Sequence, residues 1–501
     1  MTGRSTPSSG HHEDIETYYA SVQDEEAQEV FRDLDDHSVL DEGLLSVENP
    51  TVQNFVVDFG ASDARVAFDL SVRAIAALLS APRPESLSSR WLNIWQPSVQ
   101  QPLLNRLAQR YDFSPRLLAL MCSDPKQANR PAPSSLQSPP KRGLRWRRKS
   151  KARDCPTFTE KGSDELSEHS SISSHHSAAS GNLYNVIDEI WHYSSVDFGR
   201  NYVCLGYNSL YGTKPQNDGD DLPDQQLPHC TRVWTWLLLC SDKTIISIHE
   251  DPFPYARKDR LSAAQQRILS RTRCSLLNIF RSLSAVSYGP LSAQNPMILL
   301  PIRTRLGSTA EESAHRNTDA PGLLFYYLFE NWHNSYTLVT RKDSRYGHEL
   351  AAIRREMFSC PTLAHIDRLH RVGEELGVLR RHYESYNRII DRLLEPRVAT
   401  TASLENSRVV SEGSRSSSVD TIRPAVVTEK ESLLGVSLSS AARVRFTRLK
   451  DLIDLYALEE VQEYLQQKES LVSMVRMTSL LTDSPRHSSL TPCAHCRTFP
   501  S

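Results

Sequence analysis

The longest amphipathic pattern in the sequence, and the feature that most constrains its fold, runs from Ser439 to Leu480. Apolar residues return every three or four positions while charged residues occupy the other faces, which predicts one long helix. At 1.5 Å per residue this helix would span roughly 60 Å, more than a domain of this size can cover. The apolar stripe therefore predicts a partner, which is the helix that precedes it in the sequence, a second copy of the chain, or both.

The apolar face of this stalk helix, placed at residues 438–480, is the expected interface for assembly. Asp451 and Asp454 are three residues apart on the same helix and hence share one of its sides. One interpretation is that these carboxylates bridge a divalent cation such as Mg²⁺ between adjacent helices, and the alternative is a pair of solvated carboxylates. The expected interface residues are Phe446, Leu449, Ile453, Tyr456, Val461 and Leu465.

A second long helix is predicted over residues 361–396 by a regular heptad pattern. Its apolar residues are spaced alternately by three and four positions through more than three heptads. This spacing is typical of a coiled coil or of a long helical hairpin. The seam consists of Leu369, Val372, Leu376, Leu379, Tyr383, Tyr386, Ile390 and Leu393.

Residues 51–124 and 183–342 carry the alternating strand and helix patterns of an α/β domain. The clearest signal is a hairpin, in which Arg232–Cys240 and Thr244–Glu250 are joined by Ser-Asp-Lys. FVVDF and RWLNIW predict two further strands, and periodic apolar segments predict helices around them. The expected fold class is therefore α+β or α/β, with a mixed sheet flanked by helices, then a helical hairpin or coiled coil, then the stalk helix.

Four segments are too polar for a packed core, and we expect them to be mostly disordered. They are the acidic residues 1–50, the insert 125–182, the Ser-rich linker 397–437 and the tail 481–501. Between residues 11 and 48, thirteen acidic residues accompany a single basic one, Arg32. We expect this acidic segment to contain at most one docking helix.

The insert contains eight Lys and Arg among its residues 141–153. Such a run fits an anionic membrane surface and equally fits a nuclear-import or nucleic-acid segment, while a solvated linker explains it at least as well. Nucleic acid is an unlikely partner, because the net charge of the whole chain is −2. The basic patch consists of Lys141, Arg142, Arg145, Arg147, Arg148 and Lys149.

The sequence also argues against several classes of protein. No run of about 18 apolar residues occurs, so we expect neither a membrane span nor a pore. The motifs of phosphate-binding loops, nucleophile elbows and zinc proteases are missing, which favours a protein without enzymatic activity. A hidden hydrolase would have to use residues such as His192, Tyr193 and His249. Nine scattered cysteines and the lack of a signal peptide predict a cytoplasmic location, either free or peripheral to a membrane.

Four segments together resemble the fungal family of CorA-like magnesium-transporter proteins. They are RWLNIWQPSVQQPLLNRLAQRYDFSPRLLALM, IWHYSSVDFGRNYVCLGYNSLY, RVWTWLLLCSDKTIISIHEDPFP and LSSAARVRFTRLKDLIDLYALEEVQEYLQQKESLVSM. The resemblance implies a cytoplasmic α/β domain, paired helices and a stalk helix. In the family the stalk continues into two membrane spans with a Gly-Met-Asn signature, and the transporters are homopentamers that sense Mg²⁺ between protomers.

The sequence departs from this family after Met474, where both spans and the Gly-Met-Asn signature are missing. We therefore expect a truncated or soluble relative that self-associates or binds a membrane-embedded homologue, and that regulates magnesium transport without performing it. The alternative is a signalling scaffold that recruits partners through its basic and Ser-rich linkers.

Overall fold

A computed structural model of the chain describes most of the segments that the sequence predicts to be ordered. The basic patch and the whole of the insert 125–182 lie outside the described residues, and so do nearly all residues of the linker 397–437 and the tail 481–501. The described residues are 9–122, 193–212, 230–253, 261–288, 300, 302–303, 319–330, 333–340, 344–359, 362–395 and 435–482.

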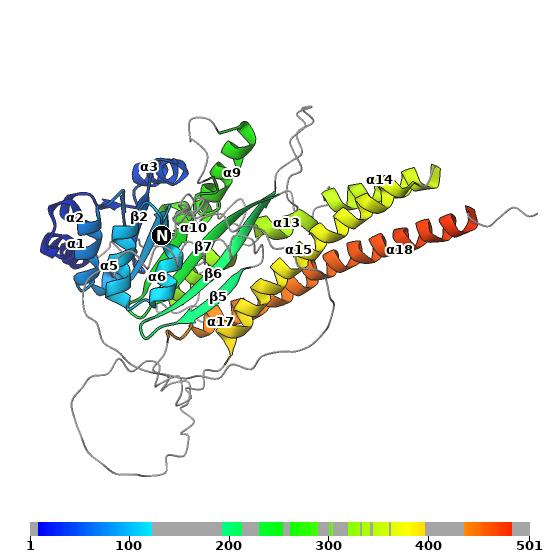
Figure 1. The fold of residues 1–501 in the computed structure, drawn as a ribbon. Coiled ribbons are helices and arrows are strands. Elements are labelled where there is room, and N and C mark those ends of the chain that lie inside the picture. Colours follow the sequence, from blue (N-terminus) through cyan, green and yellow to red (C-terminus); the bar gives the residue numbers. More distant parts are fainter. Residues whose placement is uncertain are drawn as a thin grey trace, which may run out of the picture.

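The centre of the molecule is an eight-stranded mixed sheet, flanked by helices as the sequence predicts (Figure 1). The strand order is β1-β3-β2-β4-β8-β7-β6-β5. Only β4 and β8 pair in parallel, and every other neighbouring pair is antiparallel. The strands are β1 (Arg32–Asp33), β2 (Asn54–Phe59), β3 (Ala64–Phe68), β4 (Ser89–Trp95), β5 (Ser194–Phe198), β6 (Tyr202–Gly212), β7 (Cys230–Cys240) and β8 (Thr244–His249).

The central strands are apolar on both faces because helices cover both sides of the sheet. Successive residues of a strand point to opposite faces, and this alternation sorts the strand residues into two cores. On β4, Trp91 belongs to one core and Leu92 to the other. On β6, Val203 and Cys204 divide in the same way. The continuous apolar runs of these strands follow directly from this double burial.

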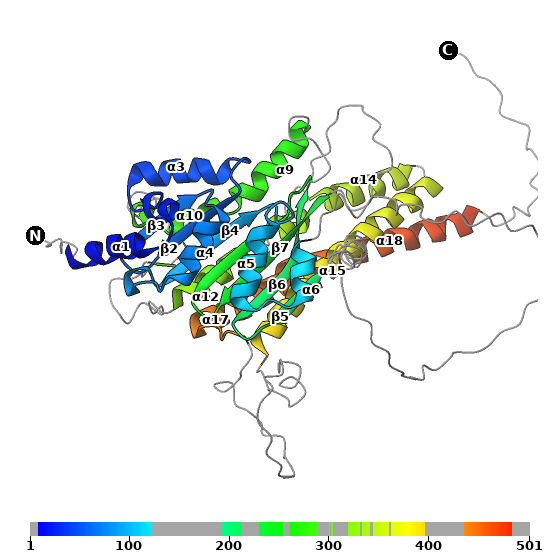
Figure 2. The ribbon, with the colours of Figure 1, turned by 60° about the vertical axis from the view of Figure 1, so that its left-hand side comes forward.

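Helices from two parts of the chain form the two outer layers (Figure 2). One face is covered by α1 (Ser9–Ser21), α2 (Glu25–Glu29), α4 (Val72–Ser80), the 3₁₀ turn η1 (Glu85–Leu87), α5 (Gln101–Tyr111) and α6 (Pro115–Met121). The opposite face is covered by α3 (His37–Glu48), α9 (Ala263–Cys274), α10 (Leu277–Ser282), the 3₁₀ turn η3 (Ala285–Tyr288), α12 (Ala320–Glu330) and α13 (His333–Thr340).

The acidic N-terminal segment is folded, so the prediction that residues 1–50 are mostly disordered is wrong from residue 9 onward. Ile15, Tyr18, Tyr19 and Val22 recur at helical spacing and are buried against the sheet. The acidic residues lie mainly between these positions, where they face solvent. The acidic composition of the segment therefore led to the wrong prediction, because the narrow apolar stripe is sufficient to pack α1 against the sheet.

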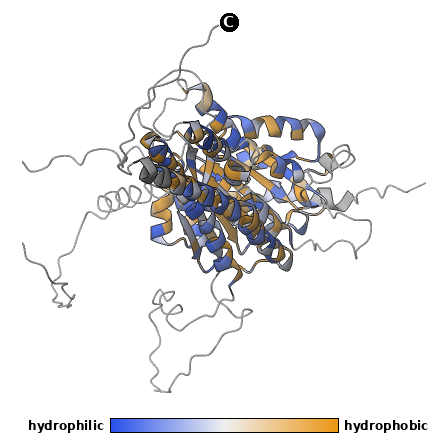
Figure 3. Cartoon of the chain, turned by 90° about the vertical axis from the view of Figure 1, so that its right-hand side faces the viewer, coloured by the Kyte–Doolittle hydropathy of each residue, from blue (hydrophilic) through white to orange (hydrophobic). Residues whose placement is uncertain are grey.

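The remaining helices form an arm that extends away from the sheet (Figure 1). They are α14 (Arg345–Ser359), α15 (Leu363–Leu394), α17 (Ser440–Ile453), the π-helical turn η7 (Asp454–Leu458) and α18 (Glu459–Thr482). The last three are consecutive and form the predicted stalk helix. Figure 3 shows hydrophobic and hydrophilic residues alternating along the arm. Within the described part of the chain, no helix combines the length and apolar character that crossing a membrane requires.

Candidate functional site

The heptad seam of α15 packs inside its own chain. All eight seam residues are buried, and they belong to the same core as the inner faces of α14, α17 and α18. The sequence left open whether the preceding helix, a second copy of the chain or both cover the stalk helix, and in the structure α15 covers its inner side together with α12. The seam residues are therefore covered without a second copy of the chain.

The arm is joined firmly to the sheet through aromatic residues at the base of α15. The hydroxyl of Tyr386 donates a hydrogen bond to the backbone oxygen of Asn208 on β6 at 2.9 Å. The rings of Tyr207 and Tyr386 meet at 5.7 Å between centroids, and Phe329 of α12 contacts both. A displacement of α15 would have to disturb these buried contacts. The arm and the sheet therefore form one packed unit.

The inner face of the stalk helix corrects part of the predicted interface. Phe446, Leu449, Ile453 and Val461 are buried within the chain, and Leu465 is half-buried. Phe446, for example, packs its ring against three aromatic side chains of α12. These four buried residues therefore cannot contact another chain in this structure, contrary to the prediction that they form an assembly interface.

Tyr456 is the sixth predicted interface residue, and it faces outward with 53% of its surface exposed. The cause is the π-helical turn Asp454–Leu458, which accommodates one residue more per turn than an α-helix. After Ile453 the next inward residue is Ala457, four positions further along the chain. Regular heptad spacing would have made Tyr456, three positions along, the inward residue instead. The prediction that Tyr456 shares a face with Ile453 is therefore wrong.

The outer face of the stalk helix carries the largest apolar side chains that this element leaves uncovered. Leu452 is 40% exposed and Leu455 is 52% exposed, and Tyr456 lies beside them. The inner apolar stripe does not predict these two leucines, because they fall between its positions. Their signal in the sequence is a second pair of apolar residues, three positions apart and outside the inner stripe.

Asp451 and Asp454 lie on this solvent-facing side, beside α15. The amide of Asn387 donates a hydrogen bond to Asp454 at 2.5 Å, and Lys450 forms an ion pair with Asp391. The hydrogen bond with Asp391 raises the pKa of Lys450, and the charges of Asp454 and Asp451 act in the same direction. The ammonium group thus already provides one positive charge to these carboxylates. Among the described residues, no three His, Cys, Asp or Glu side chains are grouped as metal ligands.

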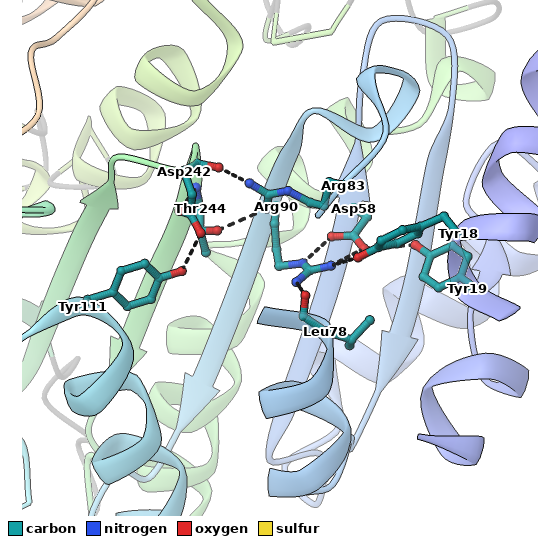
Figure 4. A network of polar contacts seen from close by, with 9 residues as sticks. All are labelled: Tyr18, Tyr19, Asp58, Leu78, Arg83, Arg90, Tyr111, Asp242 and Thr244. Atoms are coloured by element: carbon teal, nitrogen blue, oxygen red, sulfur yellow. Dashed lines mark hydrogen bonds and ion pairs between the residues drawn. The ribbon is translucent and has the colours of Figure 1, made fainter. Parts of the chain in front are cut away.

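A second polar cluster lies at the opposite end of the molecule and is fully buried (Figure 4). Arg90 on β4 forms a bidentate ion pair with Asp58 on β2, with N–O distances of 2.6 and 2.8 Å. Its remaining nitrogen contacts the backbone oxygen of Leu78 at 2.7 Å. Tyr18 accepts a hydrogen bond from Arg90, and Tyr19 donates one to Asp58. The cluster therefore connects α1 and α4 to two central strands.

The electrostatics of this cluster indicate a structural role. Burial is the largest single effect and lowers the pKa of Arg90, but the charge and the hydrogen bond of Asp58, together with Tyr18 and Tyr19, raise it above its usual value. Burial also raises the pKa of Tyr18 and, more strongly, that of Tyr19. At neutral pH the arginine thus keeps its charge and the tyrosines keep their protons. None of these groups is poised to exchange a proton with a substrate, and their joint effect is to hold α1 against the sheet.

A smaller polar group connects α5 to the turn between β7 and β8 (Figure 4). The hydroxyl of Tyr111 donates to Asp242 at 3.0 Å, and Arg83 contacts Thr244 and the backbone oxygen of Asp242. In this turn Lys243 adopts a positive φ of 63°, which tightens the predicted hairpin. These contacts fix the turn and bring no catalytic pair together.

The residues proposed for a hidden hydrolase do not converge. Tyr193 stacks on Trp234 with ring centroids 4.7 Å apart. His249 lies at the end of β8 against Trp95, and burial, with a smaller effect from the charge of Arg273, lowers its pKa to about 3. His192 is outside the described residues. An imidazole with so low a pKa is neutral and a poor base, so the described pair offers no acid–base chemistry near neutral pH.

Comparisons with known proteins do not identify this chain. No protein-family model matches its sequence, and no curated protein matches it.

Proposed function

We propose that the chain is a non-enzymatic, CorA-like cytoplasmic module that self-associates or binds a membrane-embedded homologue and regulates transport of magnesium or another divalent cation. The observation that carries the assembly function is the uncovered apolar face of the stalk helix, with Leu452, Leu455 and Tyr456 exposed side by side. Solvent-exposed leucines that are grouped on one helix commonly mark a contact surface. The likeness to the family rests on the four sequence segments and on the order of sheet, paired helices and stalk.

The distribution of titratable groups supports the non-enzymatic part of the proposal. Burial is the main cause of the large pKa shifts among the described groups. Examples are Tyr19, Cys204, Cys240 and His249. Tyr19 lies on α1, Cys204 and Cys240 lie on the paired strands β6 and β7, and His249 lies at the end of β8. A catalytic centre requires such groups to converge on a reacting atom.

The regulatory part of the proposal assigns cation sensing to Asp451 and Asp454. Both carboxylates are exposed next to the apolar face, and so an ion bound there would lie close to a partner helix. Because Lys450 already neutralises part of their charge, we expect weak binding, which a second copy of the helix would strengthen by adding carboxylates.

Sedimentation of the full-length chain with and without Mg²⁺ tests the proposal. We expect association at tens of micromolar and a larger oligomer population when Mg²⁺ is present. The double variant Asp451→Asn/Asp454→Asn should associate equally well with and without the ion. The matched control Asp367→Asn/Glu374→Gln removes two exposed carboxylates from α15 and should keep the response to Mg²⁺.

A chain that stays monomeric at these concentrations in both conditions would overturn the proposal. Flotation of this monomer with anionic vesicles, abolished by neutralising Lys141, Arg142, Arg145, Arg147, Arg148 and Lys149, would support the scaffold alternative instead.

A further inference from the structure

The outer side of the stalk helix presents one continuous row of exposed residues. Arg448, Leu452, Leu455 and Glu459 are all exposed on this side, and we call them the outer ridge. Leu455 lies within the π turn and Glu459 directly after it, so the ridge is defined by exposure and not by a constant helical period. Tyr456 lies beside this outer ridge. The opposite side of the same helix is occupied by Leu449, Ile453, Ala457 and Val461, all buried in the chain.

The outer ridge has a polarity that restricts which partner can cover it. Its first residue is positive, its two central residues are apolar and its last residue is negative. In a parallel contact between two copies, Arg448 would face Arg448 and Glu459 would face Glu459. In an antiparallel contact centred between Leu452 and Leu455, each arginine would face a glutamate and the leucines would face one another. The ridge is therefore complementary to itself in one direction only.

We propose that the outer ridge is a two-fold contact with a second, antiparallel copy of this chain. Leu452 packs against Leu455 of the second copy, and Arg448 pairs with Glu459 of the second copy, each contact occurring twice. This inference rests on the self-association in the proposed function and adds its surface, direction and register. A closed two-fold contact of this kind uses the same patch on both partners and ends at a dimer.

Intramolecular contacts leave the ridge accessible to such a partner. Helices α12 and α15 cover the inner side of the stalk helix, and the Lys450–Asp391 ion pair borders the ridge on the α15 side. The sheet lies toward the α17 end, while α18 extends away from it (Figure 1). An antiparallel contact would place the two sheets toward opposite ends of the paired helices.

The π turn explains why the ridge exists at this point of the helix. It lets Ala457 follow Ile453 as the inward residue, which leaves both Leu455 and Tyr456 on the outside. In a continuous α-helix with heptad spacing, Tyr456 would turn inward and the outer apolar patch would shrink. The π turn therefore adds exposed apolar area in the middle of the ridge, between Arg448 and Glu459.

Charge exchange within the ridge tests this contact by sedimentation equilibrium of the full-length chain. The single variants Arg448→Glu and Glu459→Arg should each weaken the dimer about tenfold or more, because two attractive pairs become repulsive. The double variant Arg448→Glu/Glu459→Arg restores opposite charges and should bring the dissociation constant back near that of the original chain. As a control, Arg371→Glu makes the same charge change at an exposed position of α15 and should have no effect.

Two results would overturn the inference. If both single variants associate as tightly as the original chain, the contact lies elsewhere, although the proposed self-association stands. If the double variant remains as weak as the single variants, the helices do not meet in antiparallel register. The unfolding midpoint of each variant is measured as a check on the fold. It should equal that of the original chain, because all altered residues are exposed. The response to Mg²⁺, which tests the proposed function, is measured separately.

Discussion

At the scale of single residues, the buried ion pair of Arg90 and Asp58 has the largest expected effect on stability. The Arg90→Leu substitution leaves the fully buried carboxylate of Asp58 without its counter-charge, although the hydroxyl of Tyr19 still donates a hydrogen bond to it. Removing one partner of such a pair typically costs about 3–5 kcal/mol, because the other charge stays uncompensated. We expect this loss in the free energy of unfolding, measured by urea denaturation.

Two comparisons separate this effect from a general sensitivity to charge changes. Arg32→Leu removes a pair with Glu42 in which both side chains are more than half exposed, and it should cost about 1 kcal/mol or less. The double variant Asp58→Leu/Arg90→Leu removes both buried charges and should lose less than the two single variants together. Equal losses for Arg90→Leu and Arg32→Leu would contradict this assignment.

The partly buried imidazole of His249 predicts a dependence of stability on pH. Burial lowers its pKa from 6.5 to about 3, so the folded state binds this proton less readily than the unfolded state. The stability that neutral His249 contributes is complete above pH 6.5 and falls by about 1.4 kcal/mol for each pH unit below it, down toward pH 3. The His249→Gln variant should therefore lose less stability between pH 6.5 and 4.5 than the original chain.

Urea titrations at pH 7.0, 6.0 and 5.0 measure this difference. His370→Gln is the matched control, since the ring of His370 is exposed on α15 and should leave the pH dependence nearly unchanged. The interpretation fails if the His249→Gln variant loses stability on acidification as steeply as the original chain.

At the scale of elements, the π turn Asp454–Leu458 determines whether Ala457 or Tyr456 faces the interior, and substitutions at these two positions test this. Ala457 is fully buried, whereas Tyr456 is half exposed. The Ala457→Leu substitution adds volume to a packed interior and should cost about 1–3 kcal/mol. The Tyr456→Ala substitution should change the free energy of unfolding by about 0.5 kcal/mol or less. A reversed order of these two effects would show that the helix continues without a π turn.

The elements differ in how well their sequences predicted them. The β7–β8 hairpin, the strands β2 and β4 and the helix α15 could be predicted because their patterns are long and regular. The short strands β1 and β3 were missed, since strands of two and five residues have no clear period and are fixed by pairing with each other and with β2. Helix α14 was also missed, although it packs on α15 and α18.

The candidate site was predictable only in part, for a related reason. Heptad spacing identified Phe446, Leu449 and Ile453 as inward residues, and all three are buried. Spacing cannot show which helix covers them, so the choice between α15 and a second copy stayed open. It also assumes a constant number of residues per turn, and the single π turn displaced Tyr456 from the inward face to the outward one.

At the scale of the whole molecule, the N-terminal segment connects both sides of the sheet. Ile15 and Tyr18 belong to the core beneath α4 and α5, whereas Leu40 and Val47 belong to the opposite core. Asp35, between these groups, accepts two hydrogen bonds from Arg303 at 2.8 and 2.9 Å. A segment that appeared from its charge to be an appendage is therefore a structural part of the folded unit.

Removal of residues 1–48 should consequently destabilise the entire fold. Each large apolar side chain that this segment buries contributes about 1.5–3 kcal/mol, and the truncated chain would expose apolar area on both faces of the sheet. We expect a chain that begins at Asn49 to unfold at a lower urea concentration, or to aggregate, with loss of hydrogen-exchange protection in β4 and in α15 alike. In the full-length chain, Ile15→Ala should reproduce part of this loss, and Glu16→Ala, at an exposed neighbouring position, should not. An unchanged unfolding midpoint after truncation would instead mean that α1 and α3 contribute little to the stability of the sheet and arm.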